Sequence, residues 1–310
     1  MNRSELAGLL SQPWAILPMA MQSLLSCCDE AEEVTHADTS PLITYYGSET
    51  TTATHPVALD MDDQDMPRQG SVVAVVPIAG VLTRHGMWGR GGMLDTGRAL
   101  AALDRNPAVG SIVLSVSSPG GTVHGTPELA DIVRGIRDRG DTRITSIADG
   151  MMASAATWIG TAASTVVATR STEVGSIGVL NAYTDFSEHL SEAGIKVDVI
   201  RRPDKKARFT GVEPMDDDMR QTLQDGVDAA YTDFLEAVAQ NRGVSVKDVE
   251  KKYGGGEVMR SDEAVEAGLI DAILDTDQHI QGELDRLRER KSLTSRRGRR
   301  AAIMEAMQKG

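Results

Sequence analysis

Three apolar segments in the middle of the chain constrain the fold most. They run from Ser71 to Gly80, from Ser111 to Val116 and from Ile144 to Ile147. Continuous runs of β-forming residues are typical of strands buried on both faces of a parallel sheet. A turn and a helix-compatible stretch follow each run, at 94–103, at 126–139 and after the last strand. Three strand–turn–helix units in succession predict an α/β fold in which helices cross over a parallel sheet.

The remaining pattern predicts shorter elements and a division of the chain into four parts. We expect strands at 166–168, 175–180, 197–201 and 269–274, and helices at 186–193, 216–241, 246–252 and 262–267. The four parts are an amphipathic, helical N-terminal element at 1–28, an acidic flexible linker at 29–70, a compact domain at 71–275 and a charged helical tail at 276–310.

Composition excludes several classes of protein. The 310 residues are 41% hydrophobic and 25% charged, which is ordinary for a globular protein, and the net charge of -13 argues against a chain that coats nucleic acid. The two cysteines, Cys27 and Cys28, are adjacent and suit neither a disulfide framework nor a four-ligand zinc site. We therefore expect a reducing compartment, with no metal and no organic cofactor.

The N-terminal apolar pattern from Trp14 to Leu25 is interrupted by Pro13 and Pro18. No run reaches the roughly 20 apolar residues needed to span a bilayer. A degenerate signal peptide is the alternative, because the start of the chain is positively charged and small residues lie near Ser26. We predict a cytoplasmic protein without a membrane anchor.

Ser154 is the candidate nucleophile. It follows the third predicted strand and the turn Asp149-Gly150, and it is predicted to lie in the first turn of the next helix. There, unpaired backbone N–H groups favour the negative charge that develops in acyl transfer. The loops after parallel strands meet at one edge of the sheet, so Gly120 and Gly121 should lie close to Ser154. A serine that merely caps or packs in an alanine-rich helix is the alternative.

An activated serine needs a general base, and the sequence offers several candidate residues for that role. His36 and His55 lie in the predicted linker, and His85, His124 and His189 have no recognisable companion motif. Lysine acts as a base when burial lowers its pKa, whereas arginine cannot give up its proton. No lysine precedes Lys196, so the candidates are Lys196, Lys205 and Lys206; a solvated basic loop is the alternative for the last two.

Several separated motifs carry a resemblance to a known family. They are Ser117-Ser118-Pro119-Gly120-Gly121, Met152-Ala153-Ser154-Ala155-Ala156 and Gly175-Ser176-Ile177-Gly178-Val179, with Gly255 to Val258 and Ala267 to Asp271 nearer the end. In order and spacing the chain resembles the signal peptide peptidase A family of serine peptidases, peptidase family S49. Within it, the chain most resembles the phage prohead or head-maturation proteases, and Trp14-Ala15-Ile16-Leu17 resembles an N-terminal element of that branch.

The resemblance implies a crotonase-like (ClpP-like) α/β fold and a Ser-Lys dyad. By motif matching, Ser154 is the nucleophile, Lys206 is the general base and Ser176 orients the lysine amine. The backbone amides of Gly120 and Gly121 form the oxyanion hole.

Lys206 is preferred over Lys205 because Glu213-Pro214 lies at the expected distance from it. The sequence departs from the family pattern in having Pro203 in place of a glycine and a second lysine beside Lys206.

The resemblance also implies the substrates and partners. We expect a serine endopeptidase that cleaves scaffold, capsid or portal proteins, or itself, inside an assembling prohead, and that forms a homo-oligomer. Nucleic acid is expected at most on the basic tail. The alternatives are a bacterial signal-peptide-peptidase-like protease, a non-catalytic assembly or scaffold protein on the same fold, and an acyl-CoA-processing crotonase, whose bases are usually carboxylates.

Overall fold

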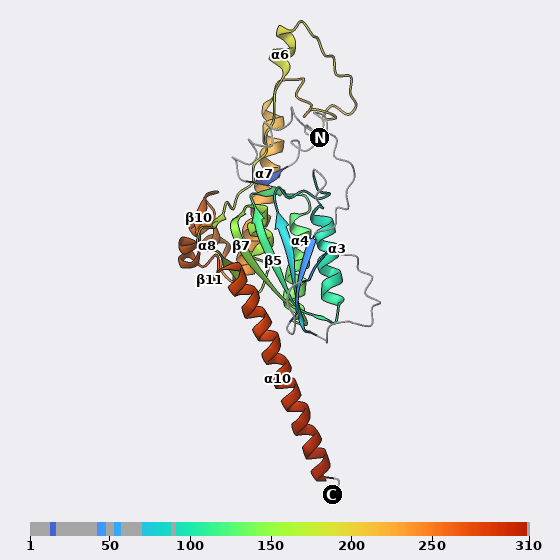
Figure 1. Ribbon diagram of the computed structural model, residues 1–310. Helices are drawn as coiled ribbons and strands as arrows, with labels where there is room; N and C mark the ends of the chain where they lie inside the picture. Colours follow the sequence, from blue (N-terminus) through green and yellow to red (C-terminus); the bar gives the residue numbers. More distant parts are fainter. Residues whose placement is uncertain (1–12, 17–41, 48–52, 57–69, 88–90, 309–310) are drawn as a thin grey trace.

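The computed structural model describes residues 13–16, 42–47, 53–56, 70–87 and 91–308. A sheet lies in the middle of the molecule, with helices packed against it (Figure 1). One long helix, α10 (Thr276–Gln308), projects from one end of this body, and an arm that carries the short helix α6 (Ser187–Glu192) projects from the other. The predictions made for residues 1–12 and 17–41 lie outside the described residues.

Three parallel strands form the centre of the sheet. They are β4 (Val72–Ala79), β5 (Val109–Ser118) and β7 (Arg143–Ala153), with β5 between the other two. The parallel α/β arrangement predicted from the three apolar runs is therefore confirmed. Parallel strands also extend the sheet beyond β7: β8 (Val166–Ala168) and β9 (Glu173–Gly175) both pair with β7, and β11 (Ala272–Ile273) pairs with β8.

Antiparallel strands close both edges of the sheet. β2 (Leu42–Gly47) pairs with β4, β3 (Ala53–Pro56) pairs with β2, and β10 (Val258–Arg260) pairs with β9. β2 and β3 fall in the segment predicted to be a flexible linker. That expectation was wrong for these residues, because Ile43 is fully buried in the core and the strand pairs along β4.

Helices follow the central strands as the sequence predicts. They are α3 (Met93–Arg105), α4 (Thr126–Arg139) and α5 (Ala155–Gly160). Later in the chain come α7 (Asp217–Arg242), α8 (Val246–Tyr253) and α9 (Ser261–Ala267). The ring of Trp158 on α5 stacks on Phe234 of α7, with centroids 4.6 Å apart, which ties the long helix to the helix that follows β7.

The central strands bury side chains on both faces, which explains their continuous apolar sequence. Along β5, Ile112 and Leu114 belong to the core beneath α3, α4 and α5, whereas Val113 belongs to a second cluster on the opposite face. Successive side chains of a strand point to opposite sides of the sheet. Both faces must therefore be covered.

α10 (Thr276–Gln308) covers the second face with its first three turns. Ile280, Leu284 and Leu287 pack there against strand residues that include Val113 and Ile147. The tail is helical, as predicted, but its beginning is part of the core rather than an appendage. Among the described residues, no helix is long and apolar enough to cross a membrane.

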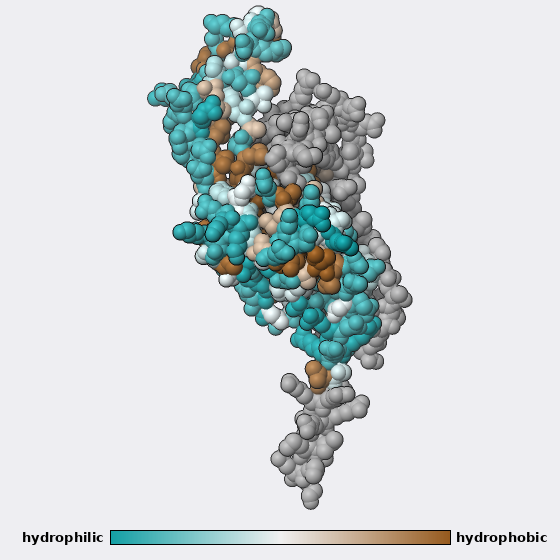
Figure 2. Space-filling model, turned by 90° about the vertical axis from the view of Figure 1, so that its left-hand side faces the viewer, coloured by the Kyte–Doolittle hydropathy of each residue, from teal (hydrophilic) through white to brown (hydrophobic). Residues whose placement is uncertain are grey.

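The arm comprises residues 181–216 and contains α6 (Ser187–Glu192). The strand predicted at 197–201 is absent there, and Ile200 is 99% exposed. An apolar segment becomes a strand only where another strand offers hydrogen-bond partners, and this segment lies outside the sheet. Hydrophobic residues are scattered among hydrophilic ones over this upper part of the molecule (Figure 2).

Candidate active site

Ser154 lies at the junction of β7 and α5, one residue before the helix begins. Its φ of 56° is in a region that side chains other than glycine rarely adopt, and the residue is only 1% exposed. The Ser154 amide donates to the carbonyl of Gly175 (2.7 Å), and its carbonyl accepts from the amide of Trp158 (3.0 Å). Backbone strain of this kind is stored at functional sites, held there by the surrounding structure.

The turn between β5 and β6 (Gly120–Thr122) lies against Ser154. Gly120 has a φ of +101°, and a Cβ atom on it would lie 2.9 Å from Cβ of Ser154. The proximity of these residues predicted from the parallel topology is therefore correct. The amide of Gly120 donates to Oγ of Ser118 (3.1 Å), which in turn donates to the carbonyl of Gly80 (2.7 Å).

Gly121 is held between two neighbouring segments. On one side, Leu82 donates its amide to the carbonyl of Gly120 (2.9 Å) and accepts from the amide of Thr122 (2.8 Å). A Cβ atom on Gly121 would lie 1.7 Å from the carbonyl oxygen of Leu82, so only glycine fits. On the other side, Gly121 pairs with Ala15 of β1 (Trp14–Ile16).

Ser176 follows β9 directly and is the neighbour of Gly175, whose carbonyl accepts from the Ser154 amide. It is 4% exposed and has a φ of 53°. Its amide donates to the carbonyl of Glu257 (2.7 Å), while the carbonyl of Gly175 accepts from both the amide of Ser154 and Oγ1 of Thr157. The motifs that carry Ser154, Gly120, Gly121 and Ser176 thus meet at one end of the central strands, as expected.

The predicted lysine base is not brought to Ser154. Lys206 is exposed in the arm, and within the described part of the chain its side chain makes no hydrogen bond or ion pair. The Ser154 hydroxyl donates instead to the carbonyl of Gly178, at a long 3.4 Å. Lys196 is exposed and lies 3.6 Å from a carboxylate oxygen of Asp198.

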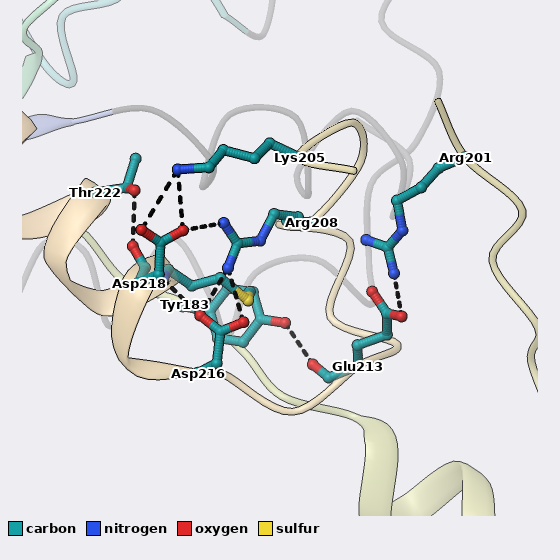
Figure 3. A network of polar contacts seen from close by, with 9 residues as sticks. Tyr183, Arg201, Lys205, Arg208, Glu213, Asp216, Asp218 and Thr222 are labelled. Atoms are coloured by element: carbon teal, nitrogen blue, oxygen red, sulfur yellow. Dashed lines mark hydrogen bonds and ion pairs between the residues drawn. The ribbon is translucent and has the colours of Figure 1, made fainter. Parts of the chain in front are cut away.

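Lys205, the lysine beside Lys206, lies in a network of ion pairs (Figure 3). Lys205 lies 3.1 Å from the carboxylate of Asp218 at the start of α7, and Arg208 bonds both that carboxylate and Asp216. Hydrogen bonds from Arg208 and Lys205 lower the pKa of Asp218. Lys205 is thus engaged by a carboxylate, whereas Lys206 beside it is not.

The sequence did not place β1 in this site. Trp14, Ala15 and Ile16 are at most 3% exposed, and they form a strand where a helix was expected. The local sequence predicted an amphipathic helix because the strand pairing of β1 with β6 joins residues more than 100 positions apart in the chain, which no local pattern reveals. Among the described residues, no group of three His, Cys, Asp or Glu side chains could hold a metal ion.

The chain is similar in sequence to phage and bacterial proteases. The family model of peptidase family S49 matches residues 138–289. Capsid assembly protease C of Escherichia phage lambda is 31% identical over 256 residues, which are 77% of this chain and 56% of the phage protein. Head-tail preconnector protein GP5 of Enterobacteria phage P21 is 29% identical over 213 residues, 67% of this chain and 42% of that protein.

Protease 4 of Salmonella typhi is 29% identical over 186 residues, covering 59% of this chain and 30% of that protein. The chain therefore spans between 30% and 56% of the length of these three relatives. Among solved structures, the chain matches a ClpP1 mutant from Listeria monocytogenes with a TM-score of 0.44 and 14% identity, over 66% of this chain and 94% of that one.

Proposed function

We propose that this chain, which matches the model of peptidase family S49 over residues 138–289, is a serine endopeptidase of that family with Ser154 as its nucleophile. The observation that carries this proposal is the strained backbone of Ser154 beside Gly120 and Gly121. A buried hydroxyl held against a glycine turn can attack a carbonyl presented along that turn. The glycines allow the close backbone approach that an oxyanion needs.

Lys206 completes the proposed dyad as the general base. A lysine acts as a base only when it is desolvated, and in the single chain Lys206 is exposed. We assign its burial, and the approach of its amine to Ser154, to a homo-oligomer in which another copy covers the arm. Phe186, Ile195 and Ile200 support this, because they are 51%, 53% and 99% exposed on the arm. Ser176 would then orient the amine.

The proposed reaction is acyl transfer in two steps. The hydroxyl oxygen of Ser154 adds to the peptide carbonyl carbon while its proton passes to the amine of Lys206. The backbone amides of Gly120 and Gly121 stabilise the oxyanion, for which Gly120 exchanges its bond to Ser118. Collapse breaks the C–N bond, and Lys206 returns the proton to the leaving amine. Water then hydrolyses the acyl ester.

The substrates we propose are scaffold, capsid or portal proteins, cleaved during assembly of a phage head in the host cytoplasm. The names of the two phage relatives support this choice over a bacterial signal-peptide-peptidase role.

Three variants test the dyad. Each is co-expressed with scaffold and capsid proteins as test substrates and analysed by intact-protein mass spectrometry. Ser154→Ala and Lys206→Ala should lower cleavage by at least about 10⁴-fold without unfolding the protein, because residues that act as one catalytic unit fail together.

Lys205→Ala is the matched control and should retain cleavage, because its ammonium already pairs with Asp218. Full activity of Lys206→Ala together with loss in Lys205→Ala would overturn the assignment of the base. Uncut partners with the unsubstituted protein would overturn the function.

A further inference from the structure

The N-terminal strand β1 lies between two segments that border Ser154. On one side it pairs antiparallel with β6, with Ala15 opposite Gly121 and Ile16 opposite Gly120. On the other side, the amide of Trp14 donates to the carbonyl of Leu180 and the amide of Leu180 donates back, both at 2.9 Å. The carbonyl of Pro13 accepts from the amide of Val123 (3.1 Å), which extends the pairing by one residue.

Both bordering segments belong to the candidate active site. Gly120 and Gly121 are the predicted oxyanion residues, and Leu180 lies two residues after Gly178, whose carbonyl accepts from the Ser154 hydroxyl. A peptide that adds as a strand between such edges gains main-chain hydrogen bonds on both sides. In this structure β1 already makes those bonds.

On the side of Gly120 where a Cβ atom would project, the nearest group is the carbonyl of Ala15. A Cβ atom built on Gly120 would be 2.3 Å from the carbonyl oxygen of Ala15 and 2.9 Å from Cβ of Ser154. The two groups therefore lie on the same side of Gly120. A substrate carbonyl must occupy this region to be attacked by Ser154.

The side chains of β1 alternate as a strand requires. Trp14 and Ile16 pack together with Val81, Met87 and Leu180, whereas the small side chain of Ala15 enters the main core beside the sheet. The position facing the core thus accepts a small residue, and the positions on either side accept bulky apolar ones.

We propose that Trp14–Ile16 occupies the substrate position of this peptidase as an internal competitor, which must leave before another polypeptide can bind. The proposal rests on the proposed function and deepens it by naming the substrate class. The preferred substrate is an extended polypeptide with a small residue against Ser154, flanked by bulky apolar residues. Because β1 is tethered to the site, its effective concentration is high and it competes strongly with free substrate.

The first test weakens the strand without touching Ser154, Gly120 or Gly121. The variant Trp14→Ala/Ile16→Ala removes both anchoring side chains, and the probe is an internally quenched peptide with the sequence of residues 12–18. Truncating either buried side chain weakens the binding of β1 to the site by more than about tenfold. Since a weaker competitor leaves the site open more often, we expect kcat/KM for the peptide to rise at least about tenfold.

Ile43→Ala is the matched control, because Ile43 is also buried but lies in β2, which β4 and β5 separate from β7 in the sheet. It should leave kcat/KM unchanged. A folded double variant with unchanged or lower kcat/KM would show that β1 is a fixed part of the site, and would overturn the proposal.

The second test uses the unsubstituted protein and decides the question if the double variant does not fold. The probe is the aldehyde acetyl-Pro-Trp-alaninal, whose carbonyl carbon is attacked by the Ser154 oxygen to give a hemiacetal, with the proton moving to the aldehyde oxygen. We expect amide hydrogen exchange of residues 14–16 to rise at least about tenfold, while the amide of Leu180 stays protected by the probe.

Each outcome of the second test has one meaning. Inhibition by the aldehyde with unchanged amide exchange at Trp14 would refute the proposal that β1 is an internal competitor, while the proposed peptidase function would be supported. Absence of any hydrolysis and of any adduct that depends on Ser154 would overturn the proposed function and this inference together.

Discussion

Glu283 on α10 offers a sharp test of how this helix is held on the sheet. Its carboxylate is 4% exposed and accepts hydrogen bonds from Oγ of Ser111 (2.8 Å) and from Nε of Arg143 (3.1 Å). Replacing Glu283 by alanine removes one partner of a buried ion pair, which lowers the free energy of unfolding by about 3–5 kcal/mol when the other charge stays buried. Arg143 is 34% exposed, so water can hydrate its charge in the variant. We therefore expect a smaller loss of stability, about 2–3 kcal/mol.

The assay is thermal unfolding followed by circular dichroism. For a folded region of about 200 residues, each kcal/mol lowers Tm by about 2–4 °C, so Glu283→Ala should lower Tm by about 4–12 °C. Glu289→Ala, at an exposed position of the same helix, is the matched control and should change Tm by about 1 °C or less. Equal Tm values for the two variants would refute the reasoning that the buried pair holds α10.

Three other substitutions have outcomes that the structure determines. Gly121→Ala should abolish peptide hydrolysis, because its Cβ would overlap the Leu82 carbonyl; Gly226→Ala, with open space around it on α7, should instead raise stability by about 0.5–1 kcal/mol in the same melts. Activity retained in Gly121→Ala would contradict the close approach at this turn. Burial lowers the pKa of His279, so the unfolded chain binds more protons than the folded one, and stability should fall as pH drops below the unfolded value of about 6.5. A urea titration at several pH values should show that His279→Gln lacks this loss; the same slope in both proteins would count against it.

Much of the fold follows from local sequence. The alternation of Ile112, Val113 and Leu114 within one apolar run identifies a strand buried on both faces, and α4 begins and ends where its sequence predicts. Parallel topology then brings Gly120 and Ser154 to one edge. The docking of α10 was missed although Ile280, Leu284 and Leu287 recur at helical spacing, because the many charges of this segment indicated a solvated helix.

The sequence by itself determined the central parallel sheet, its crossover helices and the meeting of the serine and glycine motifs, because burial and periodicity are local properties. Only the tertiary structure decided which further segments pair as strands around this centre. Leu42–Gly47 became a strand and residues 197–201 did not, and Trp14–Ile16 lies beside Ser154. Edge pairing depends on hydrogen-bond partners far away in the chain, and no local pattern of residues specifies those partners.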